Sequence, residues 1–119
     1  MVSIRRLLNS FRFAFRGFGQ LVQSEQNFRV HLIASVLAIF LGVYFNIKVW
    51  QWSLIVLVIG AVLILEILNT VFERMVDMLK PRLHEYVGEI KDMMSAVVLV
   101  ASIASAIIGA LIFLPYFLD

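Results

Sequence analysis

The sequence predicts an all-α membrane protein, with one amphipathic helix on the membrane surface and three transmembrane helices. Of the 119 residues, 62% are hydrophobic and only 15% are charged. A soluble domain has about half apolar and about a quarter charged residues. The apolar residues are gathered in three runs, each near the roughly 20 residues that a helix needs to cross a bilayer. Residues 1-119 are therefore expected to form a single integral-membrane domain.

Composition and motif content exclude several kinds of site. The chain has no cysteine, which excludes disulfides and thiolate metal sites. It has neither a G-x-x-x-x-G-K-S/T loop nor a G-x-G-x-x-G loop, so the standard nucleotide cradles are absent. The two histidines, His31 and His84, match no metal-ligand spacing. No cleavable signal peptide is expected, because Arg5 and Arg6 are followed by more arginines instead of a continuous apolar core.

Residues 3–23 are predicted to form the surface helix. Its arginines cluster on one flank, and its apolar side chains recur every three or four positions: Ile4, Leu7, Leu8, Phe11, Phe15, Phe18 and Val22. A basic amphipathic helix of this length lies flat in the membrane interface. Phe13 falls on the polar side and does not fit the pattern. Ser24 is predicted to cap the N-terminus of the next helix.

The transmembrane helices are predicted at residues 28–46, 49–72 and 93–117. Of the ten Lys and Arg residues, five precede Val30 and four lie between the second and third spans. The positive-inside rule therefore places the N-terminus and the second loop in the cytoplasm and the C-terminus outside. Pro81, in the second loop, is expected to end one helix or to begin the next.

Two further patterns concern the ends and faces of the spans. Aromatic residues near the outer ends are expected to form an interfacial belt: Tyr44, Trp50, Trp52, Tyr116 and Phe117. Small residues four apart form a ridge on the third span: Ala101, Ser105 and Gly109. Such a ridge is expected to serve helix packing or a subunit interface.

A stripe of polar side chains follows the second apolar run. At about 100° per residue, its five members fall within roughly 80° of one another on a helix: Glu66, Asn69, Thr70, Glu73 and Asp77. Like charges at this spacing repel, so the helix gains no stability from them. At the edge of a membrane, clustered carboxylates suit the binding of a divalent cation or the movement of protons. The stripe is therefore the candidate functional site.

Two acids of the stripe have distinct expected roles. Glu66 directly follows the apolar run and suits a general base that takes a proton from a substrate hydroxyl. Its alternative is a packing role, paired with a basic residue or an amide of a neighbouring helix. Glu73 lies two turns further on and suits a metal ligand. Asp77 either belongs to the same site or only solvates the end of the helix.

Other charged residues beside the spans also have two readings. Lys91 could bind phosphate as a point charge, or it could be an interfacial lysine beside Asp92 at the start of the third span. Glu25, next to the first span, is either a capping acid or a further metal ligand. The competing class of protein is a non-catalytic membrane protein or an ion carrier. The nearly apolar outer halves at 36–43 and 54–62 argue against a carrier, which needs polar groups across the membrane.

Several segments resemble one known family over nearly the whole chain, in order and without insertions. The first are Ser10–Gly17 and Glu25–His31, which resemble the start of the small bacterial lipid kinases. Glu66–Asp77 is similar to the family pattern E-L/I-x-N-S/T-x-x-E-x-x-V-D. The Lys91-Asp92 pair, with Ala96-Val97 after it, is similar to the element K-D-x-x-A/S-A-A/V-V. The family is that of the prokaryotic diacylglycerol kinases and undecaprenol kinases.

The resemblance implies both an architecture and an activity. The family has a surface helix and three transmembrane helices, and it forms homotrimers with active sites between subunits at the cytoplasmic face of the bacterial inner membrane. The implied reaction is direct in-line transfer of the γ-phosphoryl group of ATP, with Mg²⁺, to a lipid alcohol in the bilayer. Undecaprenol is the favoured acceptor, because Glu25-x-Asn27-Phe28-x-x-His31 is more like that branch. Diacylglycerol is the alternative, and no nucleic-acid partner is expected.

The resemblance also implies a role for each matching residue. Glu66 would be the base that activates the lipid hydroxyl, and Asn69 would orient it. Glu25 and Glu73 would hold Mg²⁺ on the ATP phosphates. Lys91 would contact the β- and γ-phosphates. The remaining implied residues would shape the nucleotide or lipid pocket: Asp92, Asp77, Arg6 and Gly17.

Overall fold

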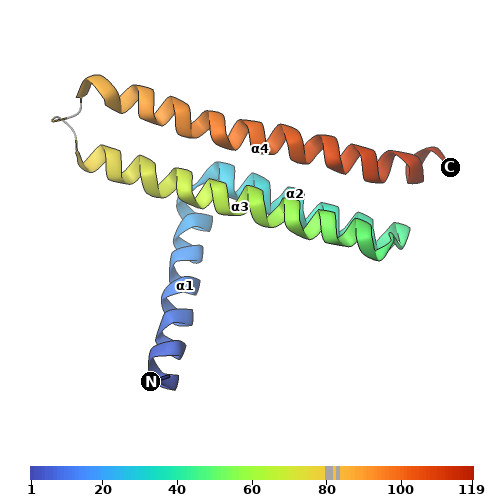
Figure 1. The fold of residues 1–119 in the computed structure, drawn as a ribbon, viewed down its shortest axis with the longest axis horizontal. Helices are drawn as coiled ribbons and strands as arrows, with labels where there is room; N and C mark the ends of the chain where they lie inside the picture. Colours follow the sequence, from blue (N-terminus) through green and yellow to red (C-terminus); the bar gives the residue numbers. More distant parts are fainter. Residues whose placement is uncertain (80–81, 83) are drawn as a thin grey trace.

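The computed structural model describes residues 1–79, 82 and 84–119, and these residues form four helices. The helices are α1 (Ile4–Ser24), α2 (Gln26–Phe45), α3 (Val49–Met78) and α4 (His84–Leu118). Helices α2, α3 and α4 form an elongated bundle, and α1 leaves it at a steep angle (Figure 1). The three bundle helices are long and apolar enough to cross a membrane. The predicted all-α fold, with one amphipathic helix and three candidate spans, is confirmed.

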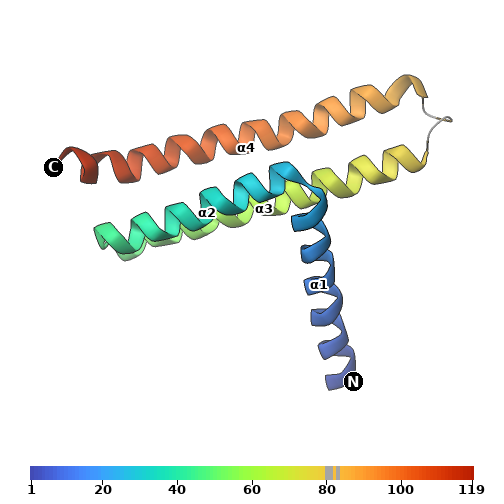
Figure 2. The same ribbon diagram turned by 180° about the vertical axis from the view of Figure 1, so that it is seen from behind.

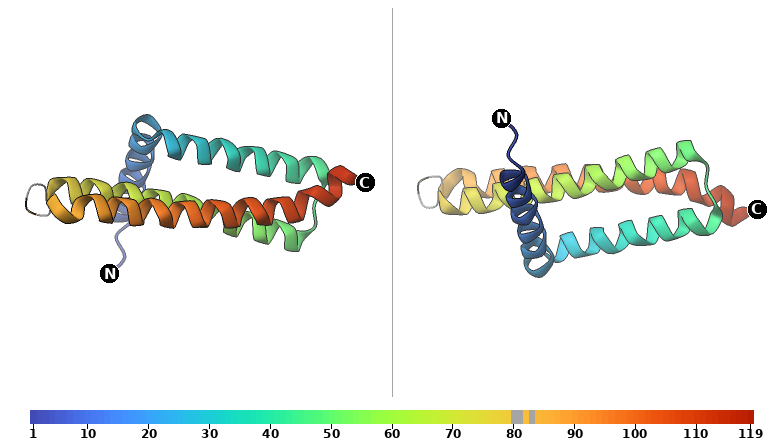
Figure 3. Two further views of the ribbon diagram at one scale, coloured as in Figure 1. Left: turned by 90° about the horizontal axis from the view of Figure 1, so that it is seen from above. Right: turned by 90° about the horizontal axis from the view of Figure 1, so that it is seen from below.

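The bundle is not equally tight on all sides. Helices α3 and α4 run side by side in antiparallel directions, and α2 packs mainly on α3 (Figures 1 and 2). Viewed along the perpendicular direction, α2 is set apart from the α3–α4 pair over much of its length (Figure 3). Contact between α2 and α4 is sparse. The side of the bundle between α2 and α4 is therefore its most loosely packed side.

The helix bounds differ from the predicted spans mainly at one end of the bundle. Helix α3 continues past residue 72 to Met78, and α4 begins at His84, nine residues before the predicted span 93–117. The two helices therefore extend beyond the α1–α2 bend as a two-helix arm (Figure 1). The positions of the membrane boundaries along these helices stay a prediction. Pro81 lies outside the described residues, as does Lys80 of the basic loop.

The bend between α1 and α2 is a single extended residue. Glu25, with φ −114° and ψ 109°, is the only residue between the two helices. Ser24 is the last residue of α1, and its hydroxyl donates to the Gln20 carbonyl at 2.8 Å. The prediction that Ser24 caps α2 is therefore wrong, because α1 runs on to this residue and uses its hydroxyl. The Arg29 guanidinium donates to the carbonyls of Val22 and Gln23 at 2.8 and 3.0 Å, which satisfies the end of α1.

Helix α1 is an exposed element in the single chain. None of its described residues is buried, and its large apolar side chains point to solvent. A membrane surface is the environment that such an amphipathic helix requires. Phe13, which does not fit the apolar pattern, lies 5.9 Å from the Arg16 guanidinium, measured to the ring centroid. Its place on the polar flank is therefore explained by a cation–π contact.

The turn between α2 and α3 is tight and well connected. Asn46 adopts the left-handed conformation, with φ 52° and ψ 55°, and its backbone N–H reaches the Gly42 and Val43 carbonyls. The Gln51 side-chain oxygen accepts from the Lys48 backbone N–H at 2.9 Å. The same oxygen accepts from the Tyr116 hydroxyl at 2.6 Å. This pair of bonds ties the turn to the last residues of α4.

The core of the bundle lies at this same end. Its buried cluster consists of Ile47, Ile55, Ile112 and Phe113. Three of the aromatic residues expected in the belt surround Phe45, with ring centroids 4.8 to 5.5 Å away: Tyr44, Tyr116 and Phe117. The depth of these rings in the membrane stays a prediction. Toward α1, the buried apolar side chains Phe28, Val76 and Val87 lie outside this cluster, and here the polar stripe lies.

Candidate active site

Glu66 is the most buried polar residue of the stripe. Its side chain is 2% exposed, and its Oε2 atom lies 3.4 Å from Nε2 of His31 on α2. Within the described part of the chain, this Oε2 has no hydrogen-bond partner. The Thr70 hydroxyl donates to the Glu66 backbone carbonyl at 3.2 Å and so points back into α3. The contact with His31 is the neighbouring-helix pair that the packing alternative predicts, but a carboxyl oxygen without a partner is costly in a purely structural role.

The residues predicted around Glu66 gather from two parts of the chain. Asn69 lies beside the Glu66 carboxyl on the same face of α3. Glu25, from the α1–α2 bend, and Glu73, from α3, both lie near enough to repel a charge on Glu66. The helical spacing of the stripe accounts for Asn69 and Glu73. The approach of Glu25 depends on the packing of α2 against α3 and was not deducible from spacing.

Arg74 holds the bend against α3. Its Nη2 atom lies 3.0 Å from the Ser24 hydroxyl and 3.4 Å from Oε1 of Glu25. In the sequence, Arg74 contributes only to the positive charges that predict membrane topology, because it lies outside the polar stripe. No signal in the spacing could have found this role, since its partners are about fifty residues away in the chain. Arg74 is therefore a site residue that only the fold identifies.

The carboxylates suit a magnesium ion that also binds phosphates. Mg²⁺ is usually held by one or two carboxylates, with substrate phosphates and waters completing the octahedron. Glu25 and Glu73 supply two such carboxylates near Glu66. Among the described residues, no group of three His, Asp or Glu side chains could hold a metal by itself. Two carboxylates suit an ion whose other ligands come from nucleotide phosphates and water.

Lys91 and Asp77 form an ion pair across the two-helix arm. The Lys91 ammonium on α4 lies 2.6 Å from Oδ1 of Asp77, the last acid of the stripe on α3. Lys91 also lies near enough to Glu73 to be attracted by its charge. The antiparallel packing of α3 and α4 therefore brings a cation to the end of the acidic stripe. Asp77 does more than solvate the end of its helix.

The last three predicted pocket residues are spread more widely. Asp92 is exposed on α4, one residue after Lys91. Arg6 is exposed in the first turns of α1, at the end that points away from the bundle (Figure 1). Gly17 lines a groove between α1 and α3. One chain therefore joins Gly17 to the site but leaves Arg6 apart from Glu66.

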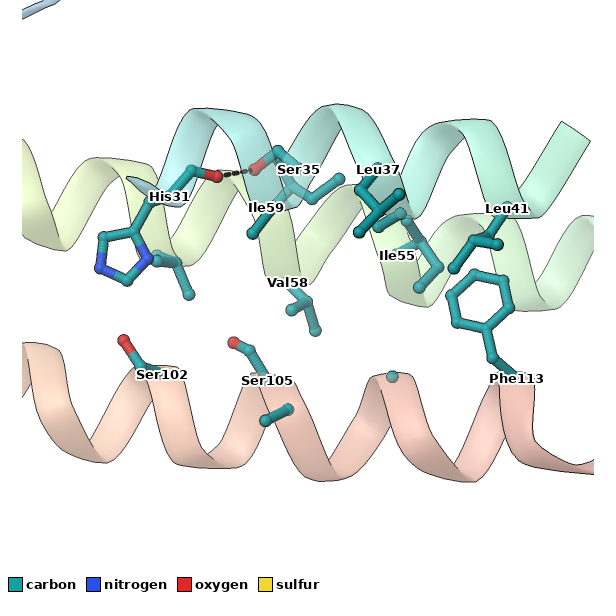
Figure 4. Close-up of a pocket in the computed structure, with 15 residues that line it drawn as sticks. His31, Ser35, Leu37, Leu41, Ile55, Val58, Ile59, Ser102, Ser105 and Phe113 are labelled. Atoms are coloured by element: carbon teal, nitrogen blue, oxygen red, sulfur yellow. Dashed lines mark hydrogen bonds between the residues drawn. The ribbon is translucent and has the colours of Figure 1, made fainter. Parts of the chain in front are cut away.

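Two hollows flank the Glu66 region. A groove of about 440 Å³ runs between α1 and α3, and its lining includes Gly17, Phe18, Thr70 and Arg74. A second cavity of about 300 Å³ lies among α2, α3 and α4. Figure 4 shows His31 at one end of this cavity and Phe113 near the other, with mostly apolar side chains between them. Both hollows are lined largely by apolar side chains.

The small-residue ridge of α4 faces the second cavity. Ser105 and Gly109 line it, together with the neighbouring Ser102 and Ala106. The Ser105 hydroxyl donates to the Ala101 carbonyl at 2.7 Å and so leaves no unused donor toward α2. Within one chain, the ridge therefore forms part of the cavity wall on α4. A subunit interface at this ridge stays a prediction.

The fold and the site define a class of protein: a small helical membrane enzyme whose acidic site lies where its spanning helices meet a surface helix. Comparison with known proteins supports this class. The family model for prokaryotic diacylglycerol kinase matches residues 12–113. The undecaprenol kinase of Bacillus subtilis (strain 168) is 35% identical over 112 residues, which cover 94% of this chain and 91% of that protein.

Two other relatives are named diacylglycerol kinases. The diacylglycerol kinase of Synechocystis sp. is 34% identical over 92% of this chain, which spans 63% of that protein. The diacylglycerol kinase of Escherichia coli (strain K12) is 29% identical over 94% of this chain and 92% of that protein. The chain belongs to the prokaryotic diacylglycerol kinase family of membrane lipid kinases. The resemblance inferred from the polar stripe is thereby confirmed.

Proposed function

We propose that this protein transfers the γ-phosphoryl group of ATP to the hydroxyl of a lipid alcohol at the cytoplasmic face of the bacterial inner membrane. The acceptor is undecaprenol, with diacylglycerol as the alternative. The observation that carries the proposal is the Glu66 carboxyl. It is 2% exposed, lies among two further carboxylates, and has an oxygen without a hydrogen-bond partner in the described structure. Such a group suits the removal of a proton from an incoming hydroxyl.

The proposed chemistry is a single in-line displacement. The lipid oxygen attacks the γ-phosphorus, the bond from that phosphorus to the β,γ-bridging oxygen breaks, and the lipid proton passes to Glu66. Asn69, beside the carboxyl, orients the hydroxyl. Glu25 and Glu73 would hold Mg²⁺, which neutralises charge on the phosphates when bound. The protein contributes mainly by positioning the reactants and by placing charge near them.

The nucleotide would lie on the side of the two-helix arm. Lys91 pairs with the last acid of the stripe, and its ammonium would move from Asp77 to the β- and γ-phosphates. Asp92, one residue on, would complete this side of the pocket. Arg6 is remote from Glu66 within one chain, which supports a site shared between chains of a homotrimer. The basic residues of the N-terminus and second loop support the cytoplasmic orientation of this side.

The choice of undecaprenol rests on the segment that forms the α1–α2 bend and the start of α2. The identities to an undecaprenol kinase and to a diacylglycerol kinase are 35% and 34%, so identity alone does not decide between them. The segment Glu25-x-Asn27-Phe28-x-x-His31 resembles the undecaprenol branch. In the structure, Phe28 is fully buried at the bend and His31 contacts Glu66. The residues that favour undecaprenol therefore belong to the site itself.

The test is phosphate transfer from labelled ATP by the purified protein in mixed micelles. Undecaprenol and diacylglycerol are assayed side by side, and Glu66→Gln serves as the control. We expect label in undecaprenol at a higher rate than in diacylglycerol, and none above background with the variant. A higher rate on diacylglycerol would select the alternative acceptor. Absence of label in both lipids, with folded protein and Mg²⁺ present, would refute the proposed activity.

A further inference from the structure

We propose that His31 is a positioning residue, which holds the Glu66 carboxyl from α2 and so fixes the direction in which the base faces. The inference deepens the proposed function and rests on the role of Glu66 as the base. It assigns a task to a side chain that lies outside the polar stripe of α3. Its test below separates a failure of this inference from a failure of the kinase proposal.

The contact joins two helices at the most buried acid of the stripe. Nε2 of His31 lies 3.4 Å from Oε2 of Glu66, and this is the carboxyl oxygen that has no hydrogen-bond partner among the described residues. The distance is slightly longer than the usual range of about 2.7–3.2 Å for an N–H···O bond. Catalytic hydrogen bonds are often long before substrate binds and shorten in the reactive complex. A small movement of α2 toward α3 would complete this one.

The charges around Glu66 explain why it needs a donor at this position. Glu25 and Glu73 both repel a negative charge on Glu66. His31 acts on the same carboxyl in the opposite sense, as an attractive partner. When Nε2 carries a hydrogen, the imidazole donates to the carboxylate whether the ring is neutral or charged. Without this donor, the carboxyl would be free to turn away from its two like-charged neighbours.

The position of the ring also connects the base to the apolar cavity. His31 forms the polar end of the cavity among α2, α3 and α4, as Figure 4 shows. The imidazole is partly exposed there, with 21% of its side chain accessible, whereas the Glu66 side chain is 2% exposed. The cavity wall on this side can therefore accept an apolar side chain in place of the ring. Loss of the His31 contact is thus separable from loss of packing.

Ser35 provides a matched control one helical turn away. It lines the same cavity on the same helix, and its hydroxyl is satisfied by the His31 backbone carbonyl at 2.7 Å. Ser35→Ala therefore alters the polarity of the cavity without removing a ring from Glu66. His31→Leu removes the donor and keeps a side chain of similar bulk. His31→Gln keeps an N–H donor at a similar distance from the backbone, without the rigid ring.

The kinetic test compares kcat with KM in the lipid phosphorylation assay. We expect His31→Leu to lower kcat by between about tenfold and a hundredfold, because displacement of a reacting group by about 1 Å costs up to about a hundredfold. The KM value for ATP should stay within about twofold, since the nucleotide would lie on the side of Lys91 and not against the ring. His31→Gln should recover part of kcat, and Ser35→Ala should match the unaltered protein. An unchanged kcat in a folded His31→Leu protein would overturn the inference.

A second measurement does not depend on activity. The chain has two histidines, so ring ¹⁵N signals of the labelled protein in micelles can be assigned by their loss in His31→Gln. We expect Glu66→Gln to shift the His31 signals and to leave those of His84 in place, with Ser35→Ala as the control. Unmoved His31 signals would overturn the inference even if His31→Leu fails to fold. A shift together with no kinase activity in the unaltered protein would instead uphold the contact and refute the proposed function.

Discussion

At the scale of single residues, the site is built around an acid that the fold does not satisfy. Glu66 is buried between α2 and α3, is repelled by Glu25 and Glu73, and has one oxygen without a hydrogen-bond partner in the described structure. Buried polar groups are nearly always paired, because an unpaired one costs free energy. A group kept in this state is typical of a catalytic centre, where stability is exchanged for reactivity.

We expect the substitution Glu66→Gln to change enzymatic activity and thermal stability in opposite directions. Glu66→Gln should lower lipid phosphorylation by at least about a hundredfold, the usual contribution of a general base. The thermal unfolding midpoint of the same protein in micelles should stay equal or rise, because the amide removes a like charge from the cluster. A large fall in the unfolding midpoint of Glu66→Gln would show that the carboxyl serves the fold.

At the scale of helices, the two ends of the bundle are built differently. The end with the α2–α3 turn is tight: Asn46 takes the left-handed conformation, and a buried cluster and the Gln51–Tyr116 bond hold α4. The other end combines buried apolar side chains with polar contacts between helices, among them the Arg74 contacts with the α1–α2 bend and the Lys91–Asp77 pair. The ion pair and the Arg74 contacts are exchangeable polar contacts, which a bound substrate could replace.

Gly42 provides a test of the tight end. A Cβ atom at this position would lie 2.6 and 2.8 Å from ring atoms of Trp52, far inside normal contact distance. Gly42→Ala should therefore destabilise the protein by about 1–3 kcal/mol, the usual cost of overpacking. Gly60→Ala is the control. Apart from its chain neighbours and the nearby backbone of its own helix, no atom of the described structure lies within 4 Å of its Cβ position. Thermal unfolding in micelles measures both, and equal midpoints for the two variants would contradict the prediction.

At the scale of the whole molecule, one chain leaves both its surface and its site incomplete. The spanning helices bury only a small part of their length within the chain, and large apolar side chains cover the outside. Lipid or further copies of the chain must cover this surface. Arg6 lies on the far part of α1, away from the stripe that it is predicted to serve. A neighbouring chain could supply it in the proposed homotrimer.

Mixing inactive chains tests the shared site. We expect Arg6→Ala and Glu66→Gln proteins, each inactive alone, to regain lipid phosphorylation when unfolded together and reassembled in micelles. An intact Arg6 from one chain would then face an intact Glu66 from another. A mixture of Glu66→Gln and Asn69→Ala should stay inactive, because both residues belong to one stripe of one helix. If the first mixture also stays inactive although both proteins assemble, the site lies within a single chain.

Much of this protein is determined locally by its sequence. Apolar runs of membrane length and the periodicity of the N-terminal segment specify four helices, because a backbone in a membrane must satisfy its own hydrogen bonds. The stripe from Glu66 to Asp77 follows from the helical repeat alone. Roles for Asn69, Glu73 and Lys91 were therefore predictable as candidates. Ser24 was mispredicted, because a helix boundary depends on which of two helices uses the hydroxyl.

Only the tertiary structure decided which distant residues meet. The contacts of His31 with Glu66, of Arg74 with Glu25, and of Lys91 with Asp77 all join different helices. Each contact depends on how far one helix is shifted and rotated relative to its neighbour. This relative position is set by the packing of side-chain ridges along the whole length of both helices. The sequence by itself thus determined the elements and the acidic face. Packing alone determined that His31 of α2 contacts the buried carboxyl of Glu66 on α3.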